Sequence, residues 1–198
     1  MKKTLNLPLR DDDISGLQAG DVVYLCGTLV TGRDEVYKRV TEEGKPLPVN
    51  LNGMAIYHAG PIVREAQAQY EIVSIGPTSS IRMEKWAAEF IEKTKVKVMI
   101  GKGGMGEKTS AACREHKAIH CVYPGGCAVL GAQQIKKIEN VYWYELGMAE
   151  CIWVMEANEF GPLIVSIDTH GKNLFAENSA FYSSHRETGM KLASSFLL

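Results

Sequence analysis

Three cationic side chains and one hydroxyl lie where predicted strands end. Arg33 and Lys102 each come just after an apolar run, and Thr78 and Arg82 lie in GPTSSIRM, where a predicted strand passes into a helix. Ligands of open α/β sheets bind beyond the carboxyl ends of the strands. We therefore expect these four side chains to lie along one edge of a sheet.

Two arginines and a lysine suit a small substrate that carries two carboxylates. A guanidinium binds a carboxylate through two parallel hydrogen bonds, whereas a lysine supplies a point charge. Arg82 lies in the first turn of a predicted helix, where a cation opposes the helix dipole, so its position favours a bound anion. Each residue taken by itself could equally form an ion pair on the surface. For Arg33 the partner would be Asp34 or Glu35.

The glycine-rich segment GKGGMG, residues 101–106, follows a predicted strand and satisfies G-x-G-x-x-G, a weak dinucleotide signature. The acidic residue expected about 20 residues later is missing from AIHCVYPGGCAV. A phosphate loop needs lysine directly after its last glycine, but Glu107 stands there. The segment is thus predicted to be a tight turn around Lys102, either close to a ligand or simply solvated.

The composition narrows the class of protein. The chain has 198 residues, 45% of them hydrophobic, and a formal net charge of −1. This suffices for one sizeable core and gives no basic excess that would attract nucleic acid or a membrane surface. No run of about 18 apolar residues is present, and MKKTLNLPLRDDD lacks the apolar segment of a signal peptide. We expect a cytoplasmic protein.

The cysteines and histidines do not form a recognisable ligand set. The five cysteines are scattered and never spaced C-x-x-C, so neither a disulfide framework nor a zinc site made by this chain alone is expected. Cys113 and His116 can share one helical face, but packing explains such a pair better. His58 and His120 lie in predicted strands and are interpreted as structural. An electrophile for catalysis would have to come from elsewhere.

The hydrophobic pattern predicts the elements that must position these side chains. Strands are predicted in MAIYHAGPIV and YEIVSIGP and over residues 22–30, 96–100, 119–123, 140–144 and 162–167. Helices are predicted in TGRDEVYKRVTEEG and SSIRMEKWAAEFIEKTK and over residues 107–116 and 128–138. A strand-rich N-terminal part followed by alternating strands and helices indicates a layered α/β fold with a mainly parallel sheet.

Five segments, in order along the chain, resemble one known family: GTLVTGRDEVYKR, LNGMAIYHAGPIV, GPTSSIRM, GKGGMG, and ELGM with FGPLIVSIDTHGKNLF. The family comprises the β subunits of L(+)-tartrate dehydratase and the C-terminal part of the class I, iron–sulfur fumarases. The resemblance implies a domain with swivelling β/β/α layers over residues 1–178, followed by a C-terminal tail over 179–198.

The resemblance also implies a hydro-lyase, an α2β2 heterotetramer whose partner α subunit carries a 4Fe-4S cluster. One cluster iron has no cysteine ligand and acts as a Lewis acid toward the substrate hydroxyl. By position in the family motifs, Arg33 and Arg82 bind the two substrate carboxylates. Lys102 is a further substrate contact, and Thr78 accepts the carbon-bound proton.

The chain departs from the family's usual GPTT or GPTTSGRM at Ser79 and Ile81, and Ile81 can reshape the pocket wall. Close similarity over residues 51–63 and 160–175 favours L(+)-tartrate, dehydrated to oxaloacetate, as the substrate. The first alternative is a β subunit of class I fumarase, which interconverts fumarate and malate. A nucleotide-binding module is a second, weaker alternative.

Overall fold

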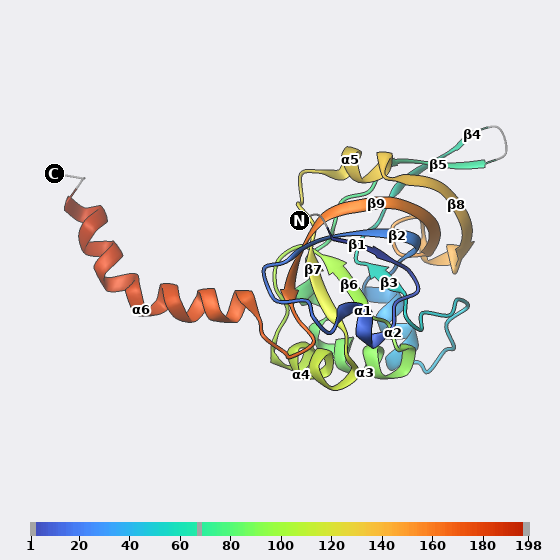
Figure 1. Cartoon of the computed structure of the whole chain (residues 1–198). Helices are drawn as coiled ribbons and strands as arrows, with labels where there is room; N and C mark the ends of the chain where they lie inside the picture. The colour runs from blue at the N-terminus through green and yellow to red at the C-terminus, as the bar shows by residue number, and fades with distance from the viewer. Residues whose placement is uncertain (1–2, 67–68, 196–198) are drawn as a thin grey trace.

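The computed structural model describes residues 3–66 and 69–195, and its centre is a seven-stranded sheet (Figure 1). The strand order is β1 (Lys3–Asn6), β2 (Val22–Thr31), β3 (Ala55–Tyr57), β6 (Val98–Gly101), β7 (Ile119–Val122), β9 (Ile152–Ile167) and β8 (Ile135–Tyr142). The first five of these strands are parallel, as predicted. β9 runs antiparallel to both of its neighbours in this order, so the sheet is mixed.

A second pairing of β9 closes the sheet on itself. β9 also runs antiparallel along β2, from Val22 opposite Ile164 to Val30 opposite Val154. The strands β2, β3, β6, β7 and β9 therefore form a closed ring, which Figure 1 shows as the curved upper part of the molecule. Closure leaves the carboxyl ends of the parallel strands together at one edge of the ring.

The apolar residues of the strands divide between two cores because successive side chains point to opposite faces. Ala55 and Tyr57 of β3 belong to the cluster inside the ring, whereas Ile56 belongs to a second cluster formed with the helices. In β6, Ile100 belongs to the cluster inside the ring and Met99 to the cluster formed with the helices. The continuous apolar runs in the sequence thus reflect strands that are buried on both faces.

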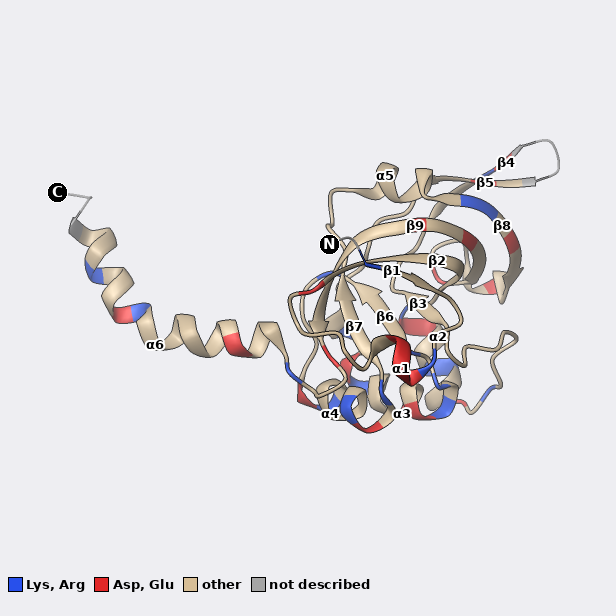
Figure 2. Cartoon of the chain, in the orientation of Figure 1, with Lys and Arg blue, Asp and Glu red and all other residues tan. Residues whose placement is uncertain are grey.

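Eight helical elements accompany the sheet in the described part of the chain. They are α1 (Asp11–Ile14), α2 (Asp34–Thr41), η1 (Ser80–Met83), α3 (Glu84–Thr94), α4 (Glu107–His116), α5 (Ala128–Gln133), η2 (Tyr144–Leu146) and α6 (Leu174–Ser195). Figure 1 shows α2, α3 and α4 on one side of the sheet and α5 on the other. Charged residues are concentrated on the first group, as expected for its solvent-facing sides (Figure 2).

The predicted α/β class, with a strand-rich N-terminal part and alternating elements after it, is confirmed. Helix α4 has the predicted bounds, 107–116. The predicted helix over 128–138 is wrong in its second half, because α5 ends at Gln133 and β8 begins at Ile135. Pairing of β8 with β9 outweighs the local helical pattern there.

Two further features project from this body, and the first still packs against it through Val63 and Ile72. β4 (Ile62–Ala66) and β5 (Gln69–Ser74) form an antiparallel hairpin. Helix α6 extends away from the body and includes much of the segment predicted as a C-terminal tail (Figure 1). Within residues 3–66 and 69–195, no helix combines the length and the apolar character needed to cross a membrane.

Candidate active site

Arg33 follows β2 and is the residue at which α2 begins. Its Nη2 lies 3.1 Å from Oε1 of Glu150, and the two side chains are 18% and 21% exposed. Burial raises the pKa of the Glu150 carboxyl, and the nearby Arg33 guanidinium opposes that shift. Nε of Arg33 is buried and has no hydrogen-bond partner among the described residues. The guanidinium therefore keeps one donor that a ligand oxygen could satisfy.

Arg82 lies in η1, directly ahead of α3. Its Nε and Nη2 donate to the two carboxylate oxygens of Asp34 over 3.0 and 2.7 Å. The anion expected beside Arg82 is thus the carboxylate of Asp34 in this structure. The alternative of an Arg33–Asp34 pair is not what the structure shows, because Arg33 pairs with Glu150 and Asp34 with Arg82. Since Asp34 is adjacent to Arg33 in the chain, the two arginines lie close together.

Thr78 and Lys102 are positioned by their backbones. The N–H of Thr78 donates to the carbonyl of His58, the residue after β3, over 2.6 Å. The N–H of Lys102, the residue after β6, donates to the carbonyl of Thr78 over 3.0 Å. The segment that carries Thr78 is thus inserted between the ends of β3 and β6 as a short extra strand. The four predicted site residues therefore gather at the expected edge of the sheet.

Gly60 provides the space that Arg33 occupies. A Cβ atom on Gly60 would lie 2.6 Å from Nη1 of Arg33 and 2.7 Å from the carbonyl oxygen of Ala149. Real Cβ atoms do not approach other atoms so closely, and the carbonyl is backbone that cannot swing away. The absence of a side chain at this position therefore allows Arg33 to reach Glu150.

The glycine-rich loop is held by side chains of the same chain. The carboxylate of Glu84, in the first turn of α3, accepts hydrogen bonds from the Gly106 N–H (2.7 Å) and from the N–H and hydroxyl of Thr109 (3.3 and 2.6 Å). On the other side, Asn173 donates to the Met105 carbonyl. Two of the N–H groups at the start of α4 that a phosphate would use, those of Gly106 and Thr109, are therefore occupied.

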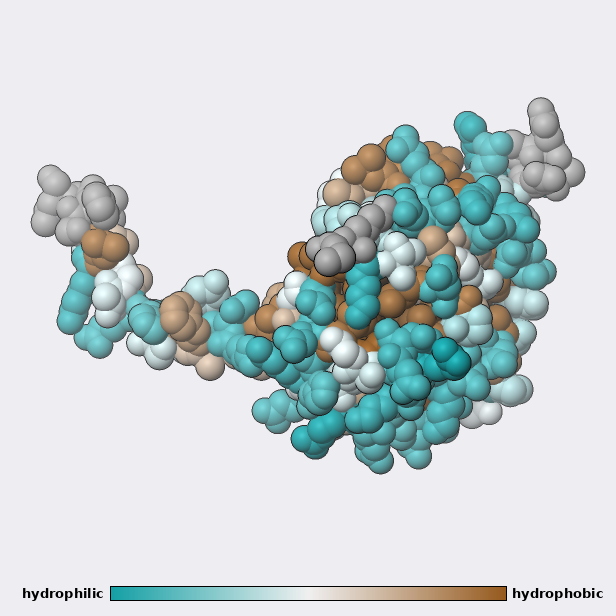
Figure 3. Space-filling model, in the orientation of Figure 1, coloured by the Kyte–Doolittle hydropathy of each residue, from teal (hydrophilic) through white to brown (hydrophobic). Residues whose placement is uncertain are grey.

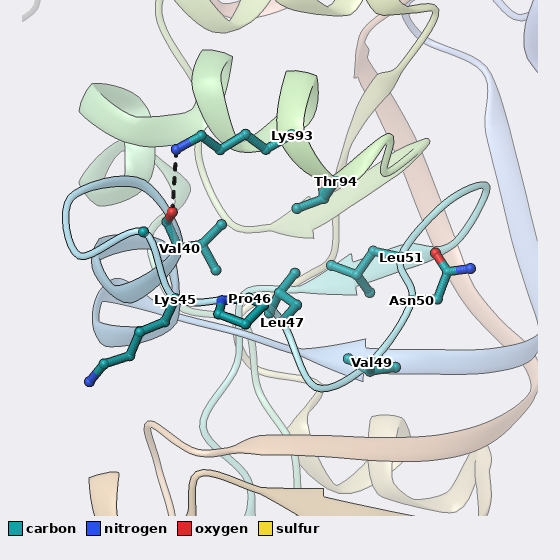
Figure 4. Close-up of a pocket in the computed structure, with 10 residues that line it drawn as sticks. Val40, Lys45, Pro46, Leu47, Val49, Asn50, Leu51, Lys93 and Thr94 are labelled. Carbon is teal, nitrogen blue, oxygen red and sulfur yellow. Dashed lines mark hydrogen bonds between the residues drawn. The ribbon is translucent and has the colours of Figure 1, made fainter.

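The surface has one hollow beside the site and another at the opposite edge of the sheet. Ile81 and Arg82 line one of about 650 Å³ together with Glu84, Lys85, Glu107 and Lys108, and the Ile81 side chain is 55% exposed. Figure 4 shows another, of about 380 Å³, between α2, α3 and the loop after α2. Its residues Leu51 and Thr94 precede β3 and β6, so it lies at the opposite, amino-terminal edge of the strands.

The thiols do not form a metal site with their neighbours. Within residues 3–66 and 69–195, no group of three or more His, Cys, Asp and Glu side chains is arranged to hold a metal ion. Cys113, Cys121 and Cys151 are buried free thiols. Burial raises the pKa of Cys113 and Cys121 strongly and that of Cys151 to about 11, so these thiols are protonated in the chain by itself.

Sequence reasoning missed two kinds of residue at this edge. Glu150 supplies the carboxylate that holds Arg33 and was not identified from the sequence, and Asp34, considered there as a partner of Arg33, holds Arg82 instead. His58, Ser80 and His120 form a buried polar cluster beneath the site, although the histidines were expected only to be structural. Their signal was present, since polar residues in otherwise apolar strands need partners.

Fold and site together define an α/β protein with cationic side chains gathered at the carboxyl ends of its parallel strands. A family model described as Fumarase C-terminus matches residues 2–178. The chain belongs to this family, as the sequence resemblance predicted.

Individual relatives agree with this assignment. The chain is 54% identical over 187 residues to the L(+)-tartrate dehydratase subunit beta of Escherichia coli K12, with 94% of this chain and 93% of that one covered. A Methanocaldococcus jannaschii protein assigned as the same subunit is 41% identical, over 94% and 98% of the two chains. A Geobacillus stearothermophilus protein assigned as a class I fumarate hydratase is 36% identical over 86% of this chain, which spans 33% of that longer protein.

Proposed function

We propose that the chain is the β subunit of a two-subunit iron–sulfur hydro-lyase that dehydrates L(+)-tartrate to oxaloacetate. The observation that carries this proposal is the 54% identity, over nearly the whole of both chains, to a tartrate dehydratase β subunit. The alternative substrate pair, fumarate and malate, is supported by the more distant relative at 36% identity.

The arginines are proposed to bind the two carboxylates of the substrate. Each guanidinium already contacts a carboxylate of this chain, Arg33 that of Glu150 and Arg82 that of Asp34. The fork at Arg82 has the paired geometry that a substrate carboxylate would use, and Arg33 keeps its unpartnered Nε. Lys102 adds a third positive charge at the same edge.

Thr78, after passing its own hydroxyl proton to another group, is proposed to take the proton from the carbon next to the one that loses hydroxide. As that C–H bond breaks, its electron pair forms the carbon–carbon double bond of an enol, which tautomerises to oxaloacetate, and water is the other product. When bound in the partner, the 4Fe-4S cluster supplies a Lewis-acidic iron for the departing hydroxide. The partner is an α subunit, with which the chain is proposed to form an α2β2 assembly.

Kinetics of the chain co-purified with its iron–sulfur α subunit test the proposal. We expect a higher kcat/KM for L(+)-tartrate than for malate, and no dehydration by the chain alone, which should be colourless. A higher kcat/KM for malate would assign the enzyme to the fumarases. A brown, iron-loaded preparation of the isolated chain would place the cluster here instead.

A further inference from the structure

A continuous set of hydrogen bonds runs beneath the site through five buried polar side chains. Tyr37 OH lies 2.7 Å from Nε2 of His58, whose Nδ1 lies 2.9 Å from Oγ of Ser80. The same Oγ lies 2.9 Å from Nε2 of His120, whose Nδ1 contacts Oγ of Ser166. All five side chains are fully buried. They come from α2, the end of β3, η1, β7 and β9.

The last member favours one direction for these bonds. The Ser166 hydroxyl lies 3.1 Å from the backbone carbonyl oxygen of His120, which can only accept, and when it donates there its oxygen accepts the Nδ1–H of that ring. Nε2 of His120 is then an acceptor for the Ser80 hydroxyl, and Ser80 in turn accepts the Nδ1–H of His58. Nε2 of His58 accepts the proton of Tyr37. In this arrangement each hydrogen is used once, and both rings are neutral Nδ1–H tautomers.

Protonation of either ring would break this order. The second nitrogen of each ring accepts a hydrogen bond, and a proton on it would face the donor. The other groups facing the rings, Tyr37, Ser80 and Ser166, are uncharged near neutral pH. Burial lowers the pKa of His120 to about 3 and, with the nearby His120, lowers the pKa of His58 well below its ordinary value. Both directions agree with neutral rings.

Ser80 connects this chain of bonds to the site. It lies between Thr78 and Arg82, and its N–H donates to the Lys102 carbonyl over 3.0 Å. It is also pressed against the loop, since a Cβ on Gly101 would lie 1.9 Å from its Oγ. Ser80 thus cannot shift without moving both the Thr78 segment and the start of the glycine-rich loop.

We propose that Ser80 is a positioning residue, which the directed chain from Tyr37 to Ser166 holds in place so that Thr78, Arg82 and Lys102 keep their relative positions. A hydroxyl is the smallest group that accepts from one imidazole and donates to the other. An apolar residue of similar size would fill the same space but leave two buried ring nitrogens without partners. The catalytic part of this inference rests on the proposed function, whereas the positioning part does not.

The first test is made on the full chain alone. Nitrogen NMR of ¹⁵N-histidine-labelled protein at pH 7 should show His58 and His120 as neutral Nδ1–H tautomers. An Nε2–H tautomer or a charged ring at either position would overturn the directed chain. In Ser80→Ala, the amide hydrogens of Thr78 and Lys102 should exchange at least tenfold faster, while those of β2 should be unchanged. Exchange within twofold of wild type at Thr78 and Lys102 would refute positioning by Ser80.

Ser194→Ala, at an exposed position on α6 where the hydroxyl only bonds back to the Met190 carbonyl, is the matched control and should alter none of these rates. If Ser80→Ala does not fold, Ser166→Ala tests the same series of hydrogen bonds from its other end. A smaller acceleration of amide hydrogen exchange at Thr78 is expected. Unchanged exchange in that variant would also count against the proposal.

In the assembled enzyme, Ser80→Ala should lower kcat/KM for tartrate at least tenfold, with part of the loss in KM because Arg82 also moves. Wild-type kcat and KM in this variant would refute the catalytic part. If exchange changes as expected but the wild-type enzyme does not dehydrate tartrate, the proposed function fails while the positioning role stands.

Discussion

The guanidinium of Arg82 and the carboxylate of Asp34 form two parallel hydrogen bonds, of 3.0 and 2.7 Å. This is the arrangement in which an arginine binds a substrate carboxylate. Asp34 therefore shows the geometry that Arg82 can offer, and a bound dicarboxylate would either share this fork or take it over.

Replacing Arg82 by lysine keeps the charge and removes the fork. We expect kcat/KM for tartrate to fall by about 30- to 1,000-fold, or about 2–4 kcal/mol, with part of the loss in KM. Arg64→Lys is the matched control, since Arg64 also contacts a carboxylate through two nitrogens, that of Glu71 on the exposed hairpin. Equal losses in the two variants would contradict a role of Arg82 in binding substrate.

Replacing Thr78 by valine keeps the shape of the side chain and removes its hydroxyl. If Thr78 accepts the proton, the loss should fall mainly on kcat, and Thr78→Ser should recover much of it. Steady-state kinetics of both variants make the comparison. A kcat within about threefold of wild type in Thr78→Val, under ~1 kcal/mol of barrier, would assign proton transfer to another residue.

Glu84→Ala removes the carboxylate that accepts three hydrogen bonds at the start of α4. The free energy of unfolding should fall by about 1–2 kcal/mol, as for loss of a helix cap. Glu89→Ala, which removes an exposed ion pair with Lys93, should change it by less than about 1 kcal/mol. Urea titration measures both. Calorimetry of the wild-type chain should detect no micromolar binding of NAD or ATP, because the Glu84 carboxylate already holds the Gly106 and Thr109 N–H groups and would repel a phosphate placed there.

The buried histidines predict a specific dependence of stability on pH. His120 has a pKa of about 3 when folded and an ordinary value near 6.5 when unfolded, so the unfolded state binds more protons between these values. Stability from this group is therefore complete above pH 6.5 and is lost as the pH falls toward 3. From pH 7 to pH 5 the loss should be about 2 kcal/mol for His120 alone, with a further loss from His58.

Urea unfolding at pH 7 and pH 5 measures this loss. His120→Asn should unfold more readily at pH 7, yet show a smaller difference between the two pH values. The control His185→Gln changes an exposed histidine on α6 and should leave the difference as in wild type. A difference that His120→Asn does not reduce would contradict a neutral, buried His120.

Local patterns predicted the fold best where packing and propensity agree. The run from Val22 to Val30 is mostly apolar and lies within β2, whose last three residues are buried in succession, and α4 has the predicted bounds. The segment after Gln133 was mispredicted because its conformation is set by a partner strand distant in sequence. The pairing of β2 with β9 could not be predicted either, because no local signal in the sequence specifies which strands pair.

The placement of the candidate site residues was predictable from the sequence, whereas their roles stay a prediction. Arg33, Thr78, Arg82 and Lys102 could be proposed because they follow strands, and strand ends share an edge. Their partners could not be found in this way. Glu150 meets Arg33 only through the packing of β9 against β2, and the contact of both histidines with one serine depends on how three separate elements fold together.

The seam between β2 and β9 has a consequence for the synthesis of the chain. The last residue of β2, Thr31, and the residue before β9, Cys151, are 120 positions apart. At about 5–20 residues per second, the ribosome needs roughly 6 to 24 seconds to produce the partner that covers this side of β2. During that interval a ten-residue, mostly apolar strand exposes an unpaired edge, a surface prone to pairing with other chains. A nascent chain should therefore need a chaperone, and truncation before Ile152 should give insoluble protein.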